Sequence, residues 1–231
     1  MKKKDLLFVL GAIMLFTPFF ISDLVYNSYT GFNKDHGMVM SFIKFAILAT
    51  AGEVIGLRIR TGNYYEQGFG IIPRAIVWGF LGLTIKLSFI IFANGAPQFL
   101  TYLGLENAIS AFKSNEFSML KLFVAFSISA SMNIIYAPLM MTLHKITDTH
   151  IMSNGGTVIG LFKPINFGKI ISNLNWDVQY NFVFKKTIPF FWIPAHTLTF
   201  MMPPELRVLF AALLGVALGV ILSIATIKSK K

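Results

Sequence analysis

Cysteine is absent from the 231 residues of the sequence. This absence excludes disulfide frameworks, thiolate nucleophiles, cysteine-ligated zinc and iron–sulfur clusters. The sequence also lacks a Gly-x-Ser-x-Gly elbow, a His-Glu-x-x-His motif, a phosphate-binding Walker loop and a paired acidic motif for a metal. We therefore predict that the protein is not an enzyme, and we expect no catalytic residue, no metal site and no cofactor.

Charge is scarce as well, because only 13% of the residues are Asp, Glu, Lys or Arg, against roughly 25% in soluble domains. Hydrophobic residues make up 55% of the chain, including 24 Phe and 11 Met, and the mean hydropathy is +0.67. A single core of this size cannot bury so many apolar side chains, so the excess must face lipid. The composition predicts an integral membrane protein, with the lipid bilayer as its main partner.

Six apolar runs are long enough, or nearly so, to cross a hydrocarbon core of about 30 Å as helices. They are residues 6–26, 37–57, 75–93, 118–143, 187–202 and 208–227. The sequence therefore predicts an all-α, polytopic membrane protein with about six transmembrane helices in a single membrane domain over residues 1–231. Residues 1–36 are expected to form an N-terminal anchor helix and loop, since no cleavage site follows the first run. Residues 37–227 are expected to form a helical bundle.

The formal net charge of +10 indicates membrane topology rather than a nucleic-acid partner. With the N-terminus in the cytoplasm, four basic residues fall on the outer side: Lys34, Lys113, Lys121 and Arg207. Lys44 and Lys86 fall within the membrane, and all other Lys and Arg residues lie on the inner side, as the positive-inside rule requires. An even number of spans places the C-terminus in the cytoplasm too. The Lys-rich N-terminus lacks the features of an organelle transit peptide, so we expect the inner (cytoplasmic) membrane of a bacterium.

Polar groups deep inside the predicted spans are the candidate site residues. An ionisable group at that depth costs at least about 2.5–3.5 kcal/mol on insertion scales, which makes each one a functional candidate. The candidates for lining a pathway are Lys44, Glu53, Lys86, Asn133 and His196. The alternative is that the lysines snorkel to the interface and that the other groups only hydrogen-bond to neighbouring helices.

Gly215 and Gly219 lie four residues apart in the last predicted span. This spacing lets two helices approach closely. The partner helix could belong to the same chain or to a second copy, so the sequence leaves open an oligomer that packs through these two glycines.

The longest polar stretch, residues 144–179, is predicted to be a loop. It contains His144 and His150, but no carboxylate cluster accompanies them in the sequence, so they indicate no metal site. An enzyme that acts on lipid head groups would need a catalytic cluster in this loop, and none is evident.

The order of the polar motifs resembles the family of small eukaryotic membrane proteins typified by the twenty-two-kilodalton peroxisomal membrane protein and the mitochondrial Mpv-seventeen protein. The family carries Gly-Asp in an early helix, where this sequence has Gly52 and Glu53. Its Arg and Gly-Pro-x-x-His motif is similar to Arg74 and residues 82–89, with Lys86 at the histidine position. Later family motifs resemble residues 132–138, 192–196 and 203–211. The resemblance covers roughly residues 45–220.

This resemblance implies channel-like or membrane-homeostasis behaviour rather than catalysis. Two lysines at midplane depth would favour anions, because rings of basic groups select negative charge. We therefore expect a narrow polar pathway for small polar or anionic solutes. The alternative is a non-conducting scaffold, whose basic cytoplasmic loops would bind anionic lipid or a protein partner.

Overall fold

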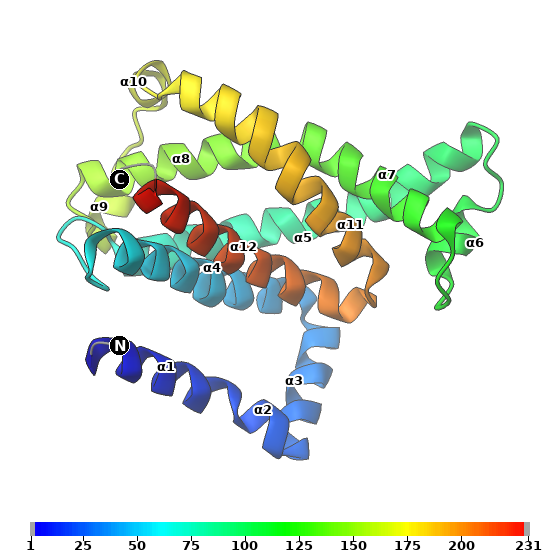
Figure 1. Ribbon diagram of the computed structural model, residues 1–231, viewed down its shortest axis with the longest axis horizontal. Helices are drawn as coiled ribbons and strands as arrows, with labels where there is room; N and C mark the ends of the chain where they lie inside the picture. The colour runs from blue at the N-terminus through cyan, green and yellow to red at the C-terminus, as the bar shows by residue number, and fades with distance from the viewer. Residues whose placement is uncertain (1–2, 229–231) are drawn as a thin grey trace. The chain divides into compact units, whose positions relative to one another are not determined.

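The structure, a computed structural model, describes residues 3–228, and all regular elements in that range are helices (Figure 1). The predicted all-α class is therefore confirmed. In chain order the elements are α1 (Lys3–Phe16), α2 (Pro18–Ile21), α3 (Asp23–Asp35), α4 (Gly37–Thr61), α5 (Ile71–Tyr102), α6 (Ala108–Lys113), α7 (Met119–Ile135), α8 (Ala137–Ser153), α9 (Val158–Leu161), α10 (Phe167–Ser172), the π-helix η1 (Val178–Trp192), α11 (Ile193–Met201) and α12 (Pro204–Lys228).

Residue contacts divide the chain into two units, residues 1–40 and 41–231. The first unit contains the predicted anchor segment as α1, α2 and α3. Ser22 begins α3 by accepting a hydrogen bond from the Val25 amide at 3.4 Å, which satisfies one of the free donors at a helix start. No residue of α1 is buried, and Leu7 and Met14 are 62% and 78% exposed. An apolar helix this exposed is suited to a lipid environment.

In the part of the chain that the structure describes, four helices are long and apolar enough to cross a membrane: Lys3–Ile21, Gly37–Thr61, Ile71–Tyr102 and Pro204–Ile221. A fifth crossing is available if α7 and α8, which meet at a bend of 45°, count as one broken span. These four or five apolar helices are compatible with a membrane protein. The predicted count of six is not confirmed, because residues 187–202 fall across the end of η1 and the short α11.

Prolines account for the bend between α7 and α8 and for the boundary between η1 and α11. Pro138 lies in the first turn of α8, and Pro194 lies in the first turn of α11. Proline has no amide hydrogen to donate and its ring clashes with the preceding turn, so it is tolerated where a helix begins and bends or ends a helix that continues through it. Each proline therefore starts a new helix at the point where the sequence predicts an uninterrupted span.

The prediction of a loop over residues 144–179 is wrong. Helix α8 continues to Ser153, and α9, α10 and the first turn of η1 occupy much of the remainder. The polar residues of α8 are accommodated because their hydroxyl groups bond within the helix: Thr147 donates to the Leu143 carbonyl and Thr149 to the Lys145 carbonyl. The polar residues of this stretch are therefore compatible with a helix and do not by themselves indicate a loop.

Small residues bring the long helices of the second unit close together. A Cβ atom added to Gly52 of α4 would lie 2.8 Å from Val216 Cα of α12, and one added to Gly219 would lie 3.1 Å from the Gly52 carbonyl oxygen. Gly82 of α5 faces α4 in the same way, since its added Cβ would lie 2.7 Å from Phe45 Cβ. Gly219 thus packs within the chain, whereas a Cβ on Gly215 would meet nothing within 4 Å.

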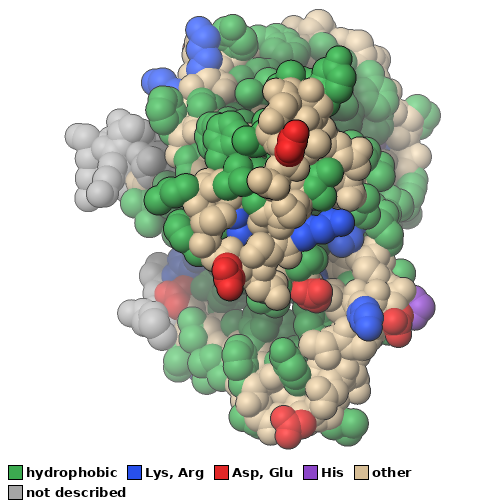
Figure 2. Space-filling view, turned by 90° about the vertical axis from the view of Figure 1, so that its right-hand side faces the viewer, with side chains coloured by type: hydrophobic (Ala, Val, Ile, Leu, Met, Phe, Trp, Pro, Cys, Tyr) green, Lys and Arg blue, Asp and Glu red, His purple; other side chains and the backbone are tan. Residues whose placement is uncertain are grey.

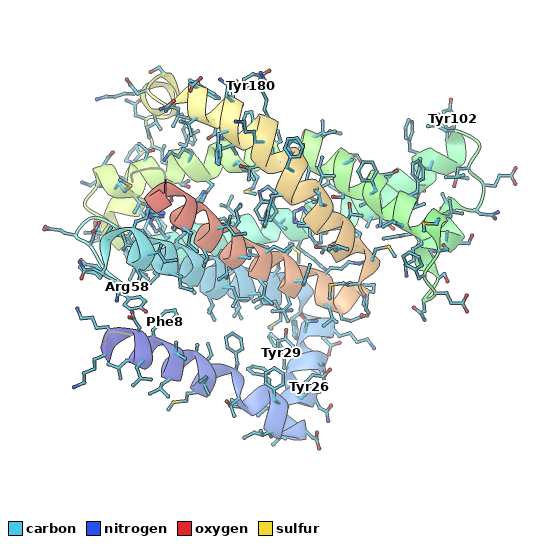
Figure 3. The ribbon with its side chains drawn as sticks, in the orientation of Figure 1. Phe8, Tyr26, Tyr29, Arg58, Tyr102 and Tyr180 are labelled. Carbon is cyan, nitrogen blue, oxygen red and sulfur yellow. The ribbon has the colours of Figure 1, made fainter. Side chains whose placement is uncertain are left out.

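Helix α7 lies at the centre of the second unit and packs against α5, α6, α8, η1 and α11. Val124, Ile128 and Phe200 are fully buried in the core around it. Tyr102, near the end of α5, and Tyr180, near the start of η1, point outward with 84% and 53% of their surface exposed (Figure 3). Aromatic side chains with a polar tip are favoured at membrane–water interfaces.

Candidate functional site

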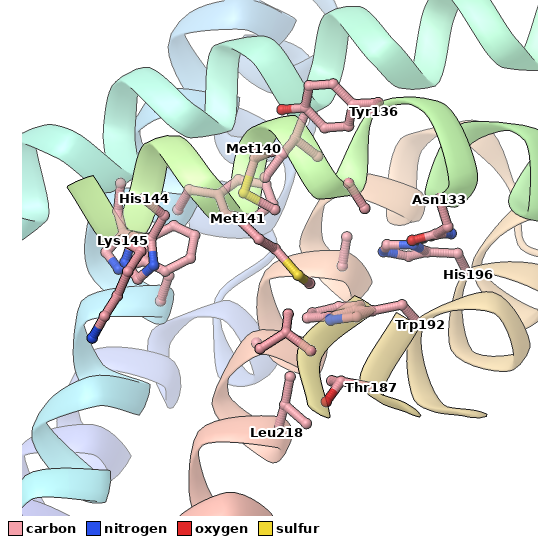
Figure 4. Close-up of a pocket in the computed structure, with 18 of the residues that line it drawn as sticks. Asn133, Tyr136, Met140, Met141, His144, Lys145, Thr187, Trp192, His196 and Leu218 are labelled. Atoms are coloured by element: carbon pink, nitrogen blue, oxygen red, sulfur yellow. Dashed lines mark hydrogen bonds between the residues drawn. The ribbon is translucent and has the colours of Figure 1, made fainter. Parts of the chain in front are cut away.

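A cavity of about 340 Å³ lies in the second unit, between α4, α5, α7, α8, η1, α11 and α12 (Figure 4). We call it the central cavity. Its middle is apolar, with Met141 and Leu218 in the wall, and polar side chains lie at two ends: His144 at one, Asn133 and His196 at the other (Figure 4). This volume falls within the range typical of small-molecule sites.

Four ionisable side chains from three helices form a cluster at the His144 end: Glu53, Arg74, His144 and Asp148. The Arg74 guanidinium, 5% exposed, is its centre. Arg74 Nη1 donates both to Glu53 Oε2 and to Asp148 Oδ1, the latter at 2.6 Å, and Arg74 Nε donates to the Phe69 carbonyl at 2.7 Å. One guanidinium therefore joins α4, α5 and α8.

Glu53 is held from three sides. Besides the Arg74 contact, Glu53 Oε1 accepts a hydrogen bond from Trp78 Nε1 at 2.8 Å and lies 2.9 Å from His144 Nε2. The His144 ring packs on the Trp78 ring with 4.4 Å between centroids, and His144 Nε2 lies 3.6 Å from Asp148 Oδ1. A carboxylate so buried is tolerated only because its charge is compensated and its oxygens are hydrogen-bonded.

The same cluster has the residue types of a metal site, because ligand atoms of Glu53, His144 and Asp148 lie within 4.8 Å of one another. However, Arg74 donates to both carboxylates from Nη1. A cation therefore already lies between the two acidic groups, at the place where a divalent ion would have to bind. This arrangement favours an ion-pair cluster that ties helices together over a metal centre.

Asn133 and His196 meet at the other end of the central cavity. Asn133 is 1% exposed; its Nδ2 donates to the Ser129 carbonyl at 2.8 Å and lies 3.0 Å from His196 Nδ1. The His196 ring is stacked on Trp192 at 5.0 Å and meets the edge of Phe89 at 5.7 Å. Both predicted residues thus have hydrogen-bond partners and also line the cavity.

Two further donors in the cavity wall have no partner. Gln179 Nε2 and Trp192 Nε1 are buried, and neither makes a hydrogen bond to any described residue. Buried polar groups are nearly always hydrogen-bonded, to protein or to water, because an unpaired donor costs about 1–3 kcal/mol. Both nitrogen atoms are shielded within the wall and are not open to the cavity, so they carry this cost without a donor being presented to an occupant.

A second cavity, of about 350 Å³, is lined by Lys86, Lys113 and Arg207, with the amides of Asn94 and Gln98 beside them. We call it the basic cavity. Phe89 lines both cavities. Figure 2 looks onto the end of the molecule where α5 ends and α6 begins, and Lys and Arg side chains lie there among hydrophobic ones.

The structure brings some of the predicted site residues together and separates others. Glu53, Asn133 and His196 line the central cavity, whereas Lys86 lines the basic cavity. Lys44 is buried, with 6% of its surface exposed, and lines neither. The predicted single set of five is thus divided over two cavities and one buried position.

Sequence reasoning missed Arg74, Trp78, His144 and Asp148 as members of the Glu53 cluster. In the sequence Arg74 is an inner-side topology signal and a position of the family motif, and His144 falls in the predicted loop. A signal was available in the spacing: Arg74 and Trp78 are four residues apart, as are His144 and Asp148. Side chains at this spacing share one face of a helix, so each pair presents two polar groups to the same neighbour.

Comparisons with protein-family models, with curated proteins and with solved structures found no match for this chain.

Proposed function

We propose that this protein is a multi-pass membrane protein that forms a narrow, channel-like pathway for small polar or anionic solutes. The observation that carries the proposal is that Phe89 lines both the central cavity and the basic cavity. Two cavities that share one wall residue form a continuous route once that side chain moves. Phe89, 4% exposed and packed on His196 and Phe200, is the constriction of this route.

The chemistry of the two walls supports this route. The central cavity supplies the Glu53 cluster and the Asn133 and His196 pair. The basic cavity supplies three cationic side chains. Polar groups along a path replace the hydration shell of a solute, and an apolar constriction between them gates by excluding water.

The membrane placement is part of the same proposal. The basic residues that flank the spans favour cytoplasmic N- and C-termini and the inner membrane of a bacterium. In this orientation the Glu53 cluster lies toward the cytoplasm, and Lys113 and Arg207 lie toward the outside. The order of the polar motifs, which resembles that of the peroxisomal and mitochondrial channel-like family, supports this function.

A non-conducting scaffold is the second candidate function. The hydrogen bond between Asn133 and His196 favours it, because such pairs also hold membrane helices together without any solute. A scaffold needs no route through Phe89, so the two functions predict different fluxes when this residue is made smaller.

The test is solute flux into liposomes that contain the purified full-length chain. Swelling in solutions of small polar or anionic solutes is measured for the wild type, Phe89→Leu and the control Phe99→Leu. Phe99 lies on the same helix, is 60% exposed and lines neither cavity. We expect swelling above that of empty liposomes and a further increase with F89L only. Swelling equal to that of empty liposomes for all three proteins would leave the scaffold as the function.

A further inference from the structure

We infer that the basic cavity is a binding site for a phosphate-class oxyanion, held by Lys86, Lys113 and Arg207. This inference names the solute class of the proposed pathway and rests on that function. The shared chemistry is a tetrahedral phosphate group. It can come from free phosphate or from the head group of an anionic phospholipid that enters at the membrane surface.

The first argument is charge. Three cationic side chains line a cavity of about 350 Å³, and no Asp or Glu is among the described residues that line it. Like charges around one cavity repel one another, and the repulsion is less screened at the partly buried Lys86 and Arg207 than at the exposed Lys113. A bound anion would offset this repulsion, which nothing else in the cavity wall does.

The second argument is the availability of donors. Within residues 3–228, the ammonium groups of Lys86 and Lys113 make neither a hydrogen bond nor an ion pair. Lys113 is exposed, whereas Lys86 is only partly exposed and lies within a predicted span, where an ammonium group without a partner is costly and points to an occupant. Each ammonium retains three donors for phosphate oxygens.

The third argument is the fixed position of Arg207. Its Nε donates to the Met202 carbonyl at 2.9 Å and its Nη2 to the Phe200 carbonyl at 3.3 Å, and the guanidinium lies over the Phe112 ring at 4.8 Å. These contacts orient the guanidinium before any ligand arrives and leave Nη1 without a partner among the described residues. The charge of Glu205 acts on Arg207, but Glu205 is exposed and does not line the cavity.

The donor set suits an oxyanion with several acceptor oxygens. Arginine presents flat, directional donors to such a group, and lysines add point charges. The Asn94 amide nitrogen donates one of its two hydrogens to the Ile90 carbonyl at 2.7 Å, so its second hydrogen and the Gln98 amide remain as neutral donors.

The test uses the full-length chain in a non-ionic detergent, with binding of inorganic phosphate measured by titration calorimetry. We expect saturable binding that Lys86→Met and Arg207→Gln each weaken by about tenfold or more, the usual cost of a lost charge-assisted hydrogen bond. Lys163→Gln is the matched control, because Lys163 is exposed and lines neither cavity. Circular dichroism confirms that each variant is folded.

A second arm identifies the source of the phosphate. The same proteins are purified from nanodiscs that contain phosphatidylcholine and phosphatidylglycerol, and the retained lipid is quantified. Phosphatidylglycerol enrichment that K86M and R207Q abolish, without binding of free phosphate, assigns the site to a lipid head group. Binding of neither probe, or equal weakening by K163Q, would overturn the site. Because binding is measured without flux, a protein that binds phosphate but conducts nothing would refute the pathway and leave the site standing.

Discussion

Phe89 of α5 meets the ring of His196 of α11 edge-on, with 5.7 Å between the ring centroids. His196 belongs to the central cavity, whereas Phe89 lines the central cavity and the basic cavity alike. The contact therefore lies where a route between the two cavities would have to open. Four predictions concern the Glu53 cluster, the Asn133 and His196 pair, the packing of α5 on α4 and the route itself.

The Glu53 cluster should depend on Arg74 for stability. Arg74→Met leaves the partly buried Glu53 and Asp148 without their counter-charge, so the loss should approach the lower end, about 3 kcal/mol, of the roughly 3–5 kcal/mol that removing one partner of a fully buried ion pair costs. The free energy of unfolding in mixed detergent micelles is the measurement. The triple variant E53Q/R74M/D148N removes the charges together and should recover more than half of the loss. A loss below about 1 kcal/mol for R74M would show that the cluster contributes little.

Asn133 and His196 should be energetically coupled. Each single substitution to Ala removes the bond between the two side chains, although Asn133 keeps its bond to the Ser129 carbonyl, whereas the double variant removes both partners. A double-mutant cycle on unfolding free energy should therefore give a coupling of about 0.5–1.5 kcal/mol, the usual net value of one hydrogen bond. Strictly additive losses would mean that the two side chains act independently.

Gly82 should resist substitution because α4 lies against it. A Cβ at this position would lie 2.7 Å from Phe45 Cβ and 2.9 Å from the Ser41 carbonyl oxygen, so Gly82→Ala should destabilise the fold by about 1–3 kcal/mol. Gly95 of the same helix has nothing within 4 Å of an added Cβ, and Gly95→Ala should be neutral or stabilising by up to about 1 kcal/mol. Equal effects of the two substitutions on the thermal midpoint would contradict this packing.

The sequence predicted the class of the fold well and the site only in part. Apolar runs of about 20 residues depend on local composition, so the spans predicted at residues 37–57 and 75–93 fall within the longer α4 and α5. The bend before Pro138 and the restart at Pro194 also have local causes, but how far a proline bends or divides a span depends on the helices around it. That is why the count of six spans is not confirmed.

The site, too, depends on contacts between helices, which the sequence does not show directly. The sequence predicts that Lys44, Lys86 and Asn133 lie deep inside their spans, but depth says nothing about the direction in which a side chain points. In the structure Lys86 lines a different cavity from Asn133. The contact of Glu53 with Arg74 and His144 joins residues 21 and 91 positions apart, and no local pattern encodes such a pairing.

The most direct test of the central claim is the accessibility of single thiols on the two sides of Phe89. The chain contains no cysteine, so each introduced thiol is unique. Ala49→Cys places a thiol in the central cavity and Ala93→Cys one in the basic cavity, because these alanines line them. A membrane-impermeant thiol reagent is added to right-side-out or inverted vesicles, and the rate of labelling is measured.

With Phe89 in place, we expect A49C to be labelled from the cytoplasmic side only and A93C from the outer side only. In the Phe89→Ala background, each thiol should become reactive from the opposite side as well, while Phe99→Ala should change neither rate. Labelling of either thiol from both sides with Phe89 present, or an unchanged one-sided pattern in the F89A background, would contradict a pathway closed by Phe89.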